Sequence, residues 1–110
     1  MNDKIENTQS QMRKGILEMC ILSILEKGDA YPTEIIEELK DAKLIVVEGT
    51  LYPLLNRLKD AGYLNYQWKE STQGPPRKYY KITPEGKKLL KELKENWEDI
   101  VKSVNKIIKK

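Results

Sequence analysis

The chain has 110 residues, which is enough for one domain with one hydrophobic core. Its residues are 39% hydrophobic and 34% charged, a balance typical of a folded globular protein and not of a disordered chain. The sequence has no histidine, one cysteine and no glycine-rich phosphate loop, which excludes the commonest general base and the usual structural zinc sites. We therefore expect a binding protein with no cofactor and no metal, and not an enzyme.

The same features indicate a compartment. The single cysteine, Cys20, excludes a disulfide framework within the chain, and its apolar neighbours predict a buried, small, hydrophobic side chain. The polar N-terminal segment does not resemble a secretory signal, and the apolar run from Ile16 to Leu25 is too short to span a bilayer. We expect a cytoplasmic protein with no membrane partner.

Charge is distributed unevenly along the chain. From Glu26 to Glu48 there are seven acidic residues and three lysines, whereas from Arg57 to Lys91 there are nine basic and three acidic residues. A basic segment on an acidic background is typical of proteins that bind nucleic acids. A lysine-rich face that only contacts solvent gives the same count, so charge alone leaves both interpretations open.

The first predicted helix runs from Gln9 or Ser10 to Lys27 and ends at Gly28. It is apolar on two faces. One face is formed by Leu17, Ile21, Ile24 and Leu25, and the other by Met12, Gly15, Ile16 and Met19. A helix that is apolar on two faces is buried on two sides, and a domain of this size covers only one of them. We expect the second face to contact another chain.

Two shorter helices follow. The second predicted helix, Pro32–Lys40, begins with a proline, which is favoured in a first turn, and has an acidic outer face. The third, Glu48–Ala61, buries four leucines that share one face: Leu51, Leu54, Leu55 and Leu58. Its outer face combines donors, an aromatic ring and cations: Thr50, Tyr52, Pro53, Asn56, Arg57 and Lys59. The third helix is therefore better suited than the second to lie against DNA.

Two segments rich in aromatic and β-branched residues, Tyr63–Lys69 and Arg77–Ile82, predict a β-hairpin joined by the loop Glu70–Pro76. The two prolines that end this loop stiffen it, because proline fixes φ and removes a backbone donor. A stiff tip loses little entropy when it docks, so it can present the next residues, Arg77 and Lys78, to phosphates.

A final helix is predicted from Pro84 to Ile108, with Thr83 as its N-cap and Pro84 at its first position. Its apolar residues repeat at intervals of three and four, which is the spacing of a packed helix pair. We call these residues the seam: Leu90, Leu93, Trp97, Ile100, Val104 and Ile107. With Ile16 of the first helix, they are the predicted dimerisation residues.

This order of elements predicts a mainly α fold with one small β-hairpin, a winged helix-turn-helix followed by a long helix. We expect residues 1–83 to form the DNA-binding domain, with the first helix also in a dimer interface, and residues 84–110 to form a dimerisation helix. In this motif the second helix of the pair lies in the major groove, and the hairpin reaches an adjacent groove or the phosphates. Asn56 and Arg57 carry donors that can bond base edges.

Several stretches of the sequence also resemble the PadR family of bacterial transcription regulators. They are GTLYPLL from Gly49, Arg57-Leu58, GYL from Gly62, GPPRKYY from Gly74 and TPEG from Thr83, and the resemblance extends from about Ser10 to Ile108. The resemblance implies a dimeric repressor of the short form, in which the single C-terminal helix pairs with the first helix of the other subunit. A two-fold dimer in turn predicts a palindromic operator.

The chain departs from this family near the start of the second predicted helix. Members usually have Gly-Tyr there, and the tyrosine commonly reaches a phosphate, whereas this chain has Pro32 and Thr33. Either Thr33 or the preceding Tyr31 can take over that contact. The predicted DNA-binding residues are Tyr31, Thr33, Thr50, Tyr52, Pro53, Asn56, Arg57, Lys59, Arg77 and Lys78.

Trp97 has two interpretations. Some short members of the family resemble multidrug-responsive repressors in which paired tryptophans flank a pore between subunits, and Trp97 falls at the matching position. The predicted pore residues are Met12, Gly15, Met19 and Trp97, a set that suits a planar aromatic effector. The alternative is that Trp97 is a core residue of the seam. The other tryptophan, Trp68, ends the first predicted strand and is expected to pack.

The leading interpretation is a dimeric, sequence-specific DNA-binding repressor, with relief by an aromatic effector as a further expectation. The alternative is a winged-helix module for protein–protein assembly that binds no specific DNA. A ligand carrier without DNA binding is disfavoured by Asn56, Arg57, Arg77 and Lys78. Salt-dependent binding to duplex DNA separates these classes, because counterion release gives a steep slope for a DNA-binding protein alone.

Overall fold

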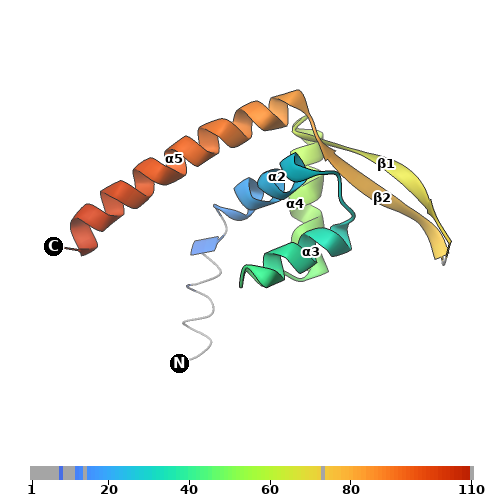
Figure 1. Ribbon diagram of the computed structural model, residues 1–110, viewed down its shortest axis with the longest axis horizontal. Coiled ribbons are helices and arrows are strands. Elements are labelled where there is room, and N and C mark those ends of the chain that lie inside the picture. Colours follow the sequence, from blue (N-terminus) through green and yellow to red (C-terminus); the bar gives the residue numbers. More distant parts are fainter. Residues whose placement is uncertain (1–7, 9–11, 14, 73, 110) are drawn as a thin grey trace.

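The structure, a computed structural model, describes residues 8, 12–13, 15–72 and 74–109. Its elements are α2 (Leu17–Lys27), α3 (Pro32–Asp41), α4 (Glu48–Asp60), β1 (Leu64–Ser71), β2 (Gly74–Ile82) and α5 (Pro84–Ile108). Helices α2, α3 and α4 form one group, the hairpin projects from one side of it, and α5 extends away on the other (Figure 1). The predicted fold class is confirmed: mainly α with a small β-hairpin, in the order of a winged helix-turn-helix. In the described residues, no helix is long and apolar enough to cross a membrane.

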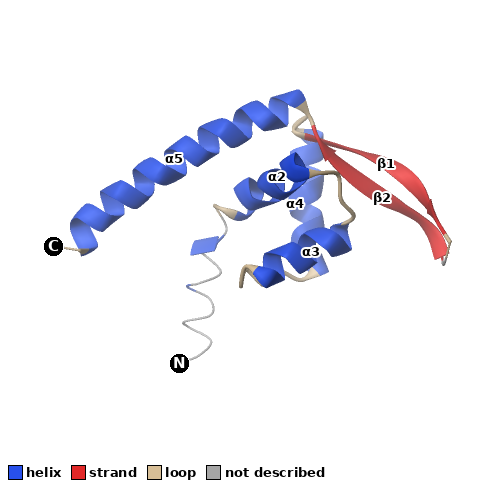
Figure 2. Ribbon diagram, in the orientation of Figure 1, coloured by secondary structure: helices blue, strands red, loops and turns tan. Residues whose placement is uncertain are grey.

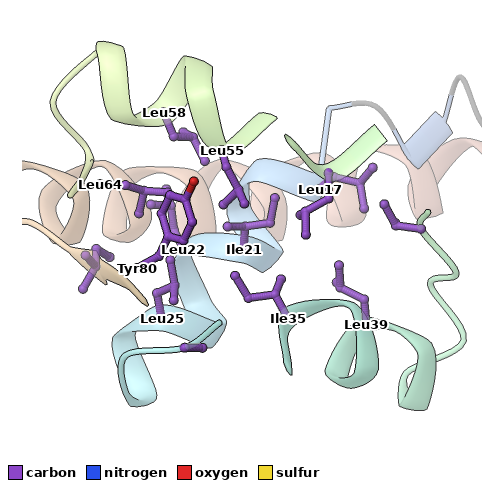
Figure 3. Close-up of a cluster of buried hydrophobic side chains, with 14 of the residues drawn as sticks. Leu17, Ile21, Leu22, Leu25, Ile35, Leu39, Leu55, Leu58, Leu64 and Tyr80 are labelled. Atoms are coloured by element: carbon purple, nitrogen blue, oxygen red, sulfur yellow. The ribbon is translucent and has the colours of Figure 1, made fainter. Parts of the chain in front are cut away.

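The hydrophobic core lies between α2, α3 and α4 and reaches the bases of the hairpin and α5 (Figure 3). Its largest fully buried side chains are Ile21, Leu22, Leu25, Ile35, Leu39, Leu51, Leu55, Leu58, Leu64, Tyr80 and Leu90. Burial of one such aliphatic side chain is worth about 1.5–3 kcal/mol before conformational entropy is counted. Because all the elements contribute to it, this cluster fixes the hairpin and α5 relative to α4.

The first predicted helix is interrupted in the part of the chain that the structure describes. Positions 12 and 13 are helical, Gly15 and Ile16 form a turn, and α2 begins at Leu17. Ile16 has φ −107°, and its amide donates to the carbonyl of residue 13. Glycine has a low helix propensity, so Gly15 is a favourable place for the interruption. The predicted start, Gln9 or Ser10, lies outside the described residues.

Cys20 of α2 is half-buried, so its predicted full burial is wrong. The side chain packs against the core from its edge, where part of it stays accessible to solvent. This partial burial raises the pKa of the thiol, because desolvation disfavours the thiolate.

The hairpin, which we call the wing, is longer than predicted (Figure 2). Its strands pair antiparallel, and the last pair before the turn is Ser71 with Gly74, after an irregularity in the register. The expected loop Glu70–Pro76 is therefore mostly strand, and Pro75 and Pro76 lie within β2. In a two-stranded sheet each strand has one unpaired edge, where the missing N–H of proline is tolerated.

The start of α5 is attached to the turn that follows α4. As predicted, Thr83 is the N-cap: its Oγ1 accepts a hydrogen bond from the Gly86 amide at 3.0 Å and donates to the Gly62 carbonyl at 2.7 Å. Gly86 also packs so closely that a methyl group there would overlap the Tyr63 carbonyl oxygen and lie 2.7 Å from Ile82 Cγ1. The first turn of α5 and the end of α4 therefore form one rigid joint.

Further along, α5 separates from the hydrophobic core. Leu90 is buried, Leu93 is half-buried, and Lys94 Nζ lies 3.6 Å from Glu26 Oε1 of α2. Beyond this point the seam is exposed, with Trp97 at 42%, Ile100 at 55%, Val104 at 45% and Ile107 at 72%. The distal half of α5 therefore presents an apolar stripe that the described residues of the protomer leave uncovered.

Candidate nucleic-acid interface

Helix α4 presents a polar face to solvent. Leu51, Leu55 and Leu58 are buried in the core, and Leu54, which was predicted to be buried with them, is only half-buried against it. The predicted contact residues of this helix are all exposed: Thr50, Tyr52, Pro53, Asn56, Arg57 and Lys59. The spacing of the helix places them on different flanks, and the partners of each flank differ.

The flank of α4 beside the wing is aromatic and basic. Lys59 Nζ lies 5.4 Å from the ring centroid of Tyr66 on β1, and Tyr52 helps to line a groove with wing residues. The opposite flank faces α2, where Arg57 Nη2 forms an ion pair with Glu18 Oε1. The Arg57 side chain is therefore engaged within the protein, although most of it is still accessible to solvent.

Three predicted DNA contacts meet at the start of α3, and one of them comes from the distant strand β2. Arg77 of β2 donates from Nη2 to Thr33 Oγ1 at 2.7 Å, and its guanidinium lies 4.2 Å from the ring centroid of Tyr31. The Tyr31 ring in turn lies 4.8 Å from that of Tyr79, which has Lys69 Nζ over it at 3.9 Å. This stack joins both strands of the wing to α3, so it fixes the wing relative to the helix-turn-helix.

The other face of the wing alternates aromatic rings with cations. Lys78 Nζ lies 4.6 Å from the ring centroid of Tyr66 and 5.5 Å from that of Trp68, and the two rings meet edge to face at 5.9 Å. Trp68 is 61% exposed, so its predicted packing role is wrong. Trp68 lies four residues along β1 from Leu64, beyond the part of the wing where Leu64 and Tyr80 reach the core. The alternation of Tyr66 and Trp68 in β1 was the sequence signal that could have placed both rings on one face.

A groove of about 270 Å³ separates the wing from α3 and α4. It is lined by Pro32, Thr33, Tyr52, Trp68, Pro76, Arg77 and Lys78, so four predicted contact residues meet there and no acid lines it. The acidic side chains of α3 instead line a neighbouring hollow, which shares Thr33 with this groove: Glu34, Glu37, Glu38 and Asp41. An anion is therefore attracted to the first surface and repelled from the second.

The residues predicted to bind an effector are brought together in part. Met12 and Trp97 line one groove of about 520 Å³ with Arg13, Ile16 and Lys43. Gly15 lies in a neighbouring groove, lined also by Leu54 and Leu93 among others, and Met19 packs against the core. In the described residues, no cluster of three or more potential metal ligands is present.

A winged helix-turn-helix with donors on its second helix and cations along its wing is the architecture of a DNA-binding transcriptional regulator. The chain matches the model of the transcriptional regulator PadR-like family over residues 21–92, and it belongs to this family. The family implies a DNA-binding regulator of transcription.

Solved structures agree with this assignment, and the chain is also similar to one curated protein. The chain is 58% identical to a PadR-like transcription factor from Bacteroides fragilis, with a TM-score of 0.78 over 92% of this chain and 98% of that one. A PadR family regulator from Eggerthella lenta is 34% identical, with a TM-score of 0.83 over 97% of this chain and 90% of that one. An uncharacterized protein of Lysinibacillus sphaericus is 30% identical over 95 residues, which are 84% of this chain and 87% of that protein.

Proposed function

We propose that the protein is a homodimeric, sequence-specific repressor that binds a palindromic operator. In this proposal α4 enters the major groove and the wing contacts the backbone beside it. The separation of charge supports this orientation most strongly, since the groove between wing and α4 has no acid in its lining and the acids of α3 line another hollow. Duplex DNA is densely negative, so it approaches on the basic side.

The contact residues have different roles in this proposal. Asn56 lies exposed on the outer face of α4, where its amide can form paired hydrogen bonds with an adenine edge and so select sequence. Lys59 and Lys78 contact phosphates and add affinity for any sequence. Tyr31, Thr33 and Arg77 act together from the stack that joins the wing to α3. Thr50, Tyr52 and Pro53 complete the surface of α4 that faces the groove of the duplex.

Arg57 requires an exchange of partners before it can contact DNA. In the free protein its guanidinium is paired with Glu18. A phosphate or a guanine edge is a comparable acceptor. The Arg57 side chain is 64% exposed and that of Glu18 is 26% exposed, so solvent screens the pair and its contribution is of the order of the 0–1 kcal/mol that is typical of surface ion pairs. The proposed Arg57 contact therefore competes with an internal one and is weaker than it would be from a free side chain.

The proposed dimer uses the exposed part of α5. Residues 1–83 form the DNA-binding domain and residues 84–110 the dimerisation helix, with the seam and Ile16 in the interface. The stripe from Trp97 to Ile107 supports this, because apolar residues at heptad spacing that lie open to solvent are typical of a helix awaiting a partner helix.

The proposed effector site is the groove that Met12 and Trp97 share. A flexible thioether and an indole suit a planar aromatic ligand. The two charged residues that line this groove, Arg13 and Lys43, are both cations. An anionic aromatic ligand is therefore favoured over a cationic one, and it relieves repression if it binds more tightly to a dimer whose α4 helices do not fit the operator.

Selection of bound sequences from a random duplex library tests the proposed function. We expect a palindromic site, with half-sites one or two helical turns apart, and binding that weakens steeply with salt. The affinity of the selected site over its scrambled version is then measured at two salt concentrations. If no sequence is enriched and binding is insensitive to salt, the repressor proposal fails and the protein-assembly alternative is favoured.

A further inference from the structure

Trp68 is an exposed tryptophan whose surroundings suit a specific partner. It lies near the end of the wing, 61% exposed, on the strand face that also carries Tyr66 and Lys78. Exposure of an indole to water is unfavourable, and the core of the protomer lies too far along the wing to cover it. The ring is held in place by its edge-to-face contact with Tyr66, so it presents an ordered apolar surface.

The charged residues that line the groove beside Trp68 are both cations. Lys78 Nζ lies 5.5 Å from the indole centroid, and Arg77 lines the same groove from the neighbouring position of β2. Across the groove stands Tyr52 of α4, and no acidic residue contributes to the lining. An apolar ring between cations matches a ligand that is itself apolar in one part and anionic in the next.

The size of the groove limits what can occupy it. Its volume of about 270 Å³ is below the range of roughly 300–1,000 Å³ that is typical of pockets for small molecules. It lies between two elements that approach DNA in the proposed function, so it suits a short stretch of an extended chain that passes through it. The Arg77–Thr33 hydrogen bond joins two of the residues that line the groove and connects the wing to α3 there.

We propose that this groove seats one deoxyribose and its phosphate from the backbone of duplex DNA, and that Trp68 is a DNA-contact residue. In a duplex the bases are stacked and paired, so the sugar–phosphate chain is the part that reaches such a site. The indole packs on the deoxyribose, and Lys78 contacts the phosphate beside it. This inference rests on the proposed DNA-binding function and adds a sequence-independent contact through an uncharged ring.

The roles of Trp68 and Lys78 can be separated by salt dependence. Wild type, Trp68→Ala, Trp68→Phe and Lys78→Gln are titrated with a fluorescent 30-base-pair duplex of mixed sequence at several salt concentrations. We expect Trp68→Ala to lower affinity about tenfold with an unchanged slope, because the indole displaces no counterion. Lys78→Gln should reduce the slope by about 0.9, and Trp68→Phe should restore most of the affinity lost in Trp68→Ala. Gln67→Ala, on the opposite face of the same strand, is the matched control and should bind as wild type does.

A second measurement reports on the ring itself in the wild-type protein. The chain has two tryptophans, so labelling with 5-fluorotryptophan gives two fluorine resonances, which the Trp68→Phe spectrum assigns. We expect the duplex to shift the Trp68 resonance and the single strand of the same sequence to shift it less.

The outcomes distinguish this inference from the proposed function. If wild type binds the duplex in a salt-dependent manner but Trp68→Ala binds equally well and the Trp68 resonance does not move, the inference is wrong and the DNA-binding function stands. If the single strand binds more tightly and shifts the Trp68 resonance more, the ring stacks on unpaired bases. That result would also contradict the proposal that the groove holds a deoxyribose and its phosphate. If wild type binds no duplex at all, both proposals fail.

Discussion

The molecule exposes its two tryptophans in surroundings that have little in common. Trp68 is 61% exposed on the wing, beside Lys78, whose ammonium group lies over the rings of Tyr66 and Trp68. Trp97 is 42% exposed on α5, in line with Ile100 and Val104 at heptad spacing. The first surface suits a polyanion and the second suits another apolar helix. Exposure alone therefore does not identify a partner; the charges and the periodicity of the neighbouring side chains do.

Charges placed in the apolar stripe of α5 should have the largest effect. Ile100→Asp with Val104→Asp buries two carboxylates in the proposed dimer interface, so we expect the dissociation constant of the dimer to rise by roughly a thousandfold or more. Both residues are exposed in the protomer, so its own fold should survive. Sedimentation of the variant at micromolar concentration should show a monomer. Lys102→Asp, on the far side of α5, is the control and should stay dimeric. If the double variant also stays dimeric, the seam is not part of the dimer interface.

The two tryptophans should differ when each is replaced by alanine. Trp97→Ala should lower the free energy of unfolding by about 1–2 kcal/mol, which is less than the 3–5 kcal/mol typical of a fully packed ring, because Trp97 lines a groove. Trp68→Ala should lower it by less than about 1 kcal/mol, since most of the indole is exposed to solvent in the folded protein. Urea unfolding measures both values. A loss of about 4 kcal/mol for Trp97→Ala would show that the ring is fully packed in the seam and does not line an open groove.

Ligand binding to the effector groove is a second way to compare wild type with Trp97→Ala. An anionic naphthalene sulfonate and a cationic dye of similar size are titrated into wild type and Trp97→Ala. We expect saturable binding of the anion to wild type, weaker by about tenfold in the variant, since stacking on each ring adds about 0.5–1.5 kcal/mol beyond area burial. Equal binding of both dyes would show that Arg13 and Lys43 do not select the charge of the ligand.

Substitution of Asn56 and substitution of Lys78 should change DNA binding in different ways. Asn56→Ala should relax preference at specific positions of the selected operator, by about 1–3 kcal/mol per base pair that it contacts. Lys78→Ala should weaken binding to all sequences alike and lower the salt slope by about one. Competition between operator and scrambled duplexes at several salt concentrations measures both effects. A change of sequence preference in Lys78→Ala with no change of slope would contradict the assigned roles.

The ion pair between Glu18 and Arg57 predicts a gain of function. Glu18→Gln frees the guanidinium, so operator affinity should rise by about two- to fivefold, in line with the 0–1 kcal/mol of an exposed pair. The double variant Glu18→Gln with Arg57→Gln should lose that gain. If Glu18→Gln instead weakens binding, the carboxylate positions Arg57 for its contact and does not compete with DNA for it.

The smallest expected effect is at the base of the wing. The Tyr80 hydroxyl is buried and has no hydrogen-bond partner in the described part of the chain, so Tyr80→Phe should change the free energy of unfolding by less than about 0.5 kcal/mol. The aromatic ring, which lies 5.5 Å from that of Tyr66, is retained. Tyr80→Leu is the contrasting variant and should be clearly destabilised. A loss above about 1.5 kcal/mol in Tyr80→Phe would indicate a buried water on the hydroxyl.

The sequence predicted the features that depend on local spacing. The leucines of α4 share one face at intervals of three and four, so its bounds and its exposed residues could be read directly. Thr83 and Pro84 marked the start of α5 for an equally local reason. The first backbone N–H groups of a helix have no partner within the helix; the threonine side chain accepts a hydrogen bond from one of them, and proline has no N–H to satisfy.

Features that depend on contacts across the chain could not be predicted in this way. The Arg77–Thr33 hydrogen bond joins residues 44 positions apart, and no spacing in the sequence indicates it. The pairing of Arg57 with Glu18 likewise depends on how α4 packs beside α2. The assignment of Pro75-Pro76 to a loop failed because the unpaired edge of a two-stranded sheet accepts prolines that a wider sheet rejects.

The close packing of Gly86 against the turn after α4 makes α5 a lever in the mechanical sense. Its 25 residues form a rod about 37 Å long, and the base of the rod packs directly against the turn that follows α4. In the proposed dimer, α5 can pivot about its C-terminal end. A pivot of about 5° moves the base of a rod of this length by about 3 Å, which is close to the 3.4 Å between successive base pairs. A ligand that adds this small rotation between two protomers would thus shift each α4 by almost one step along the operator.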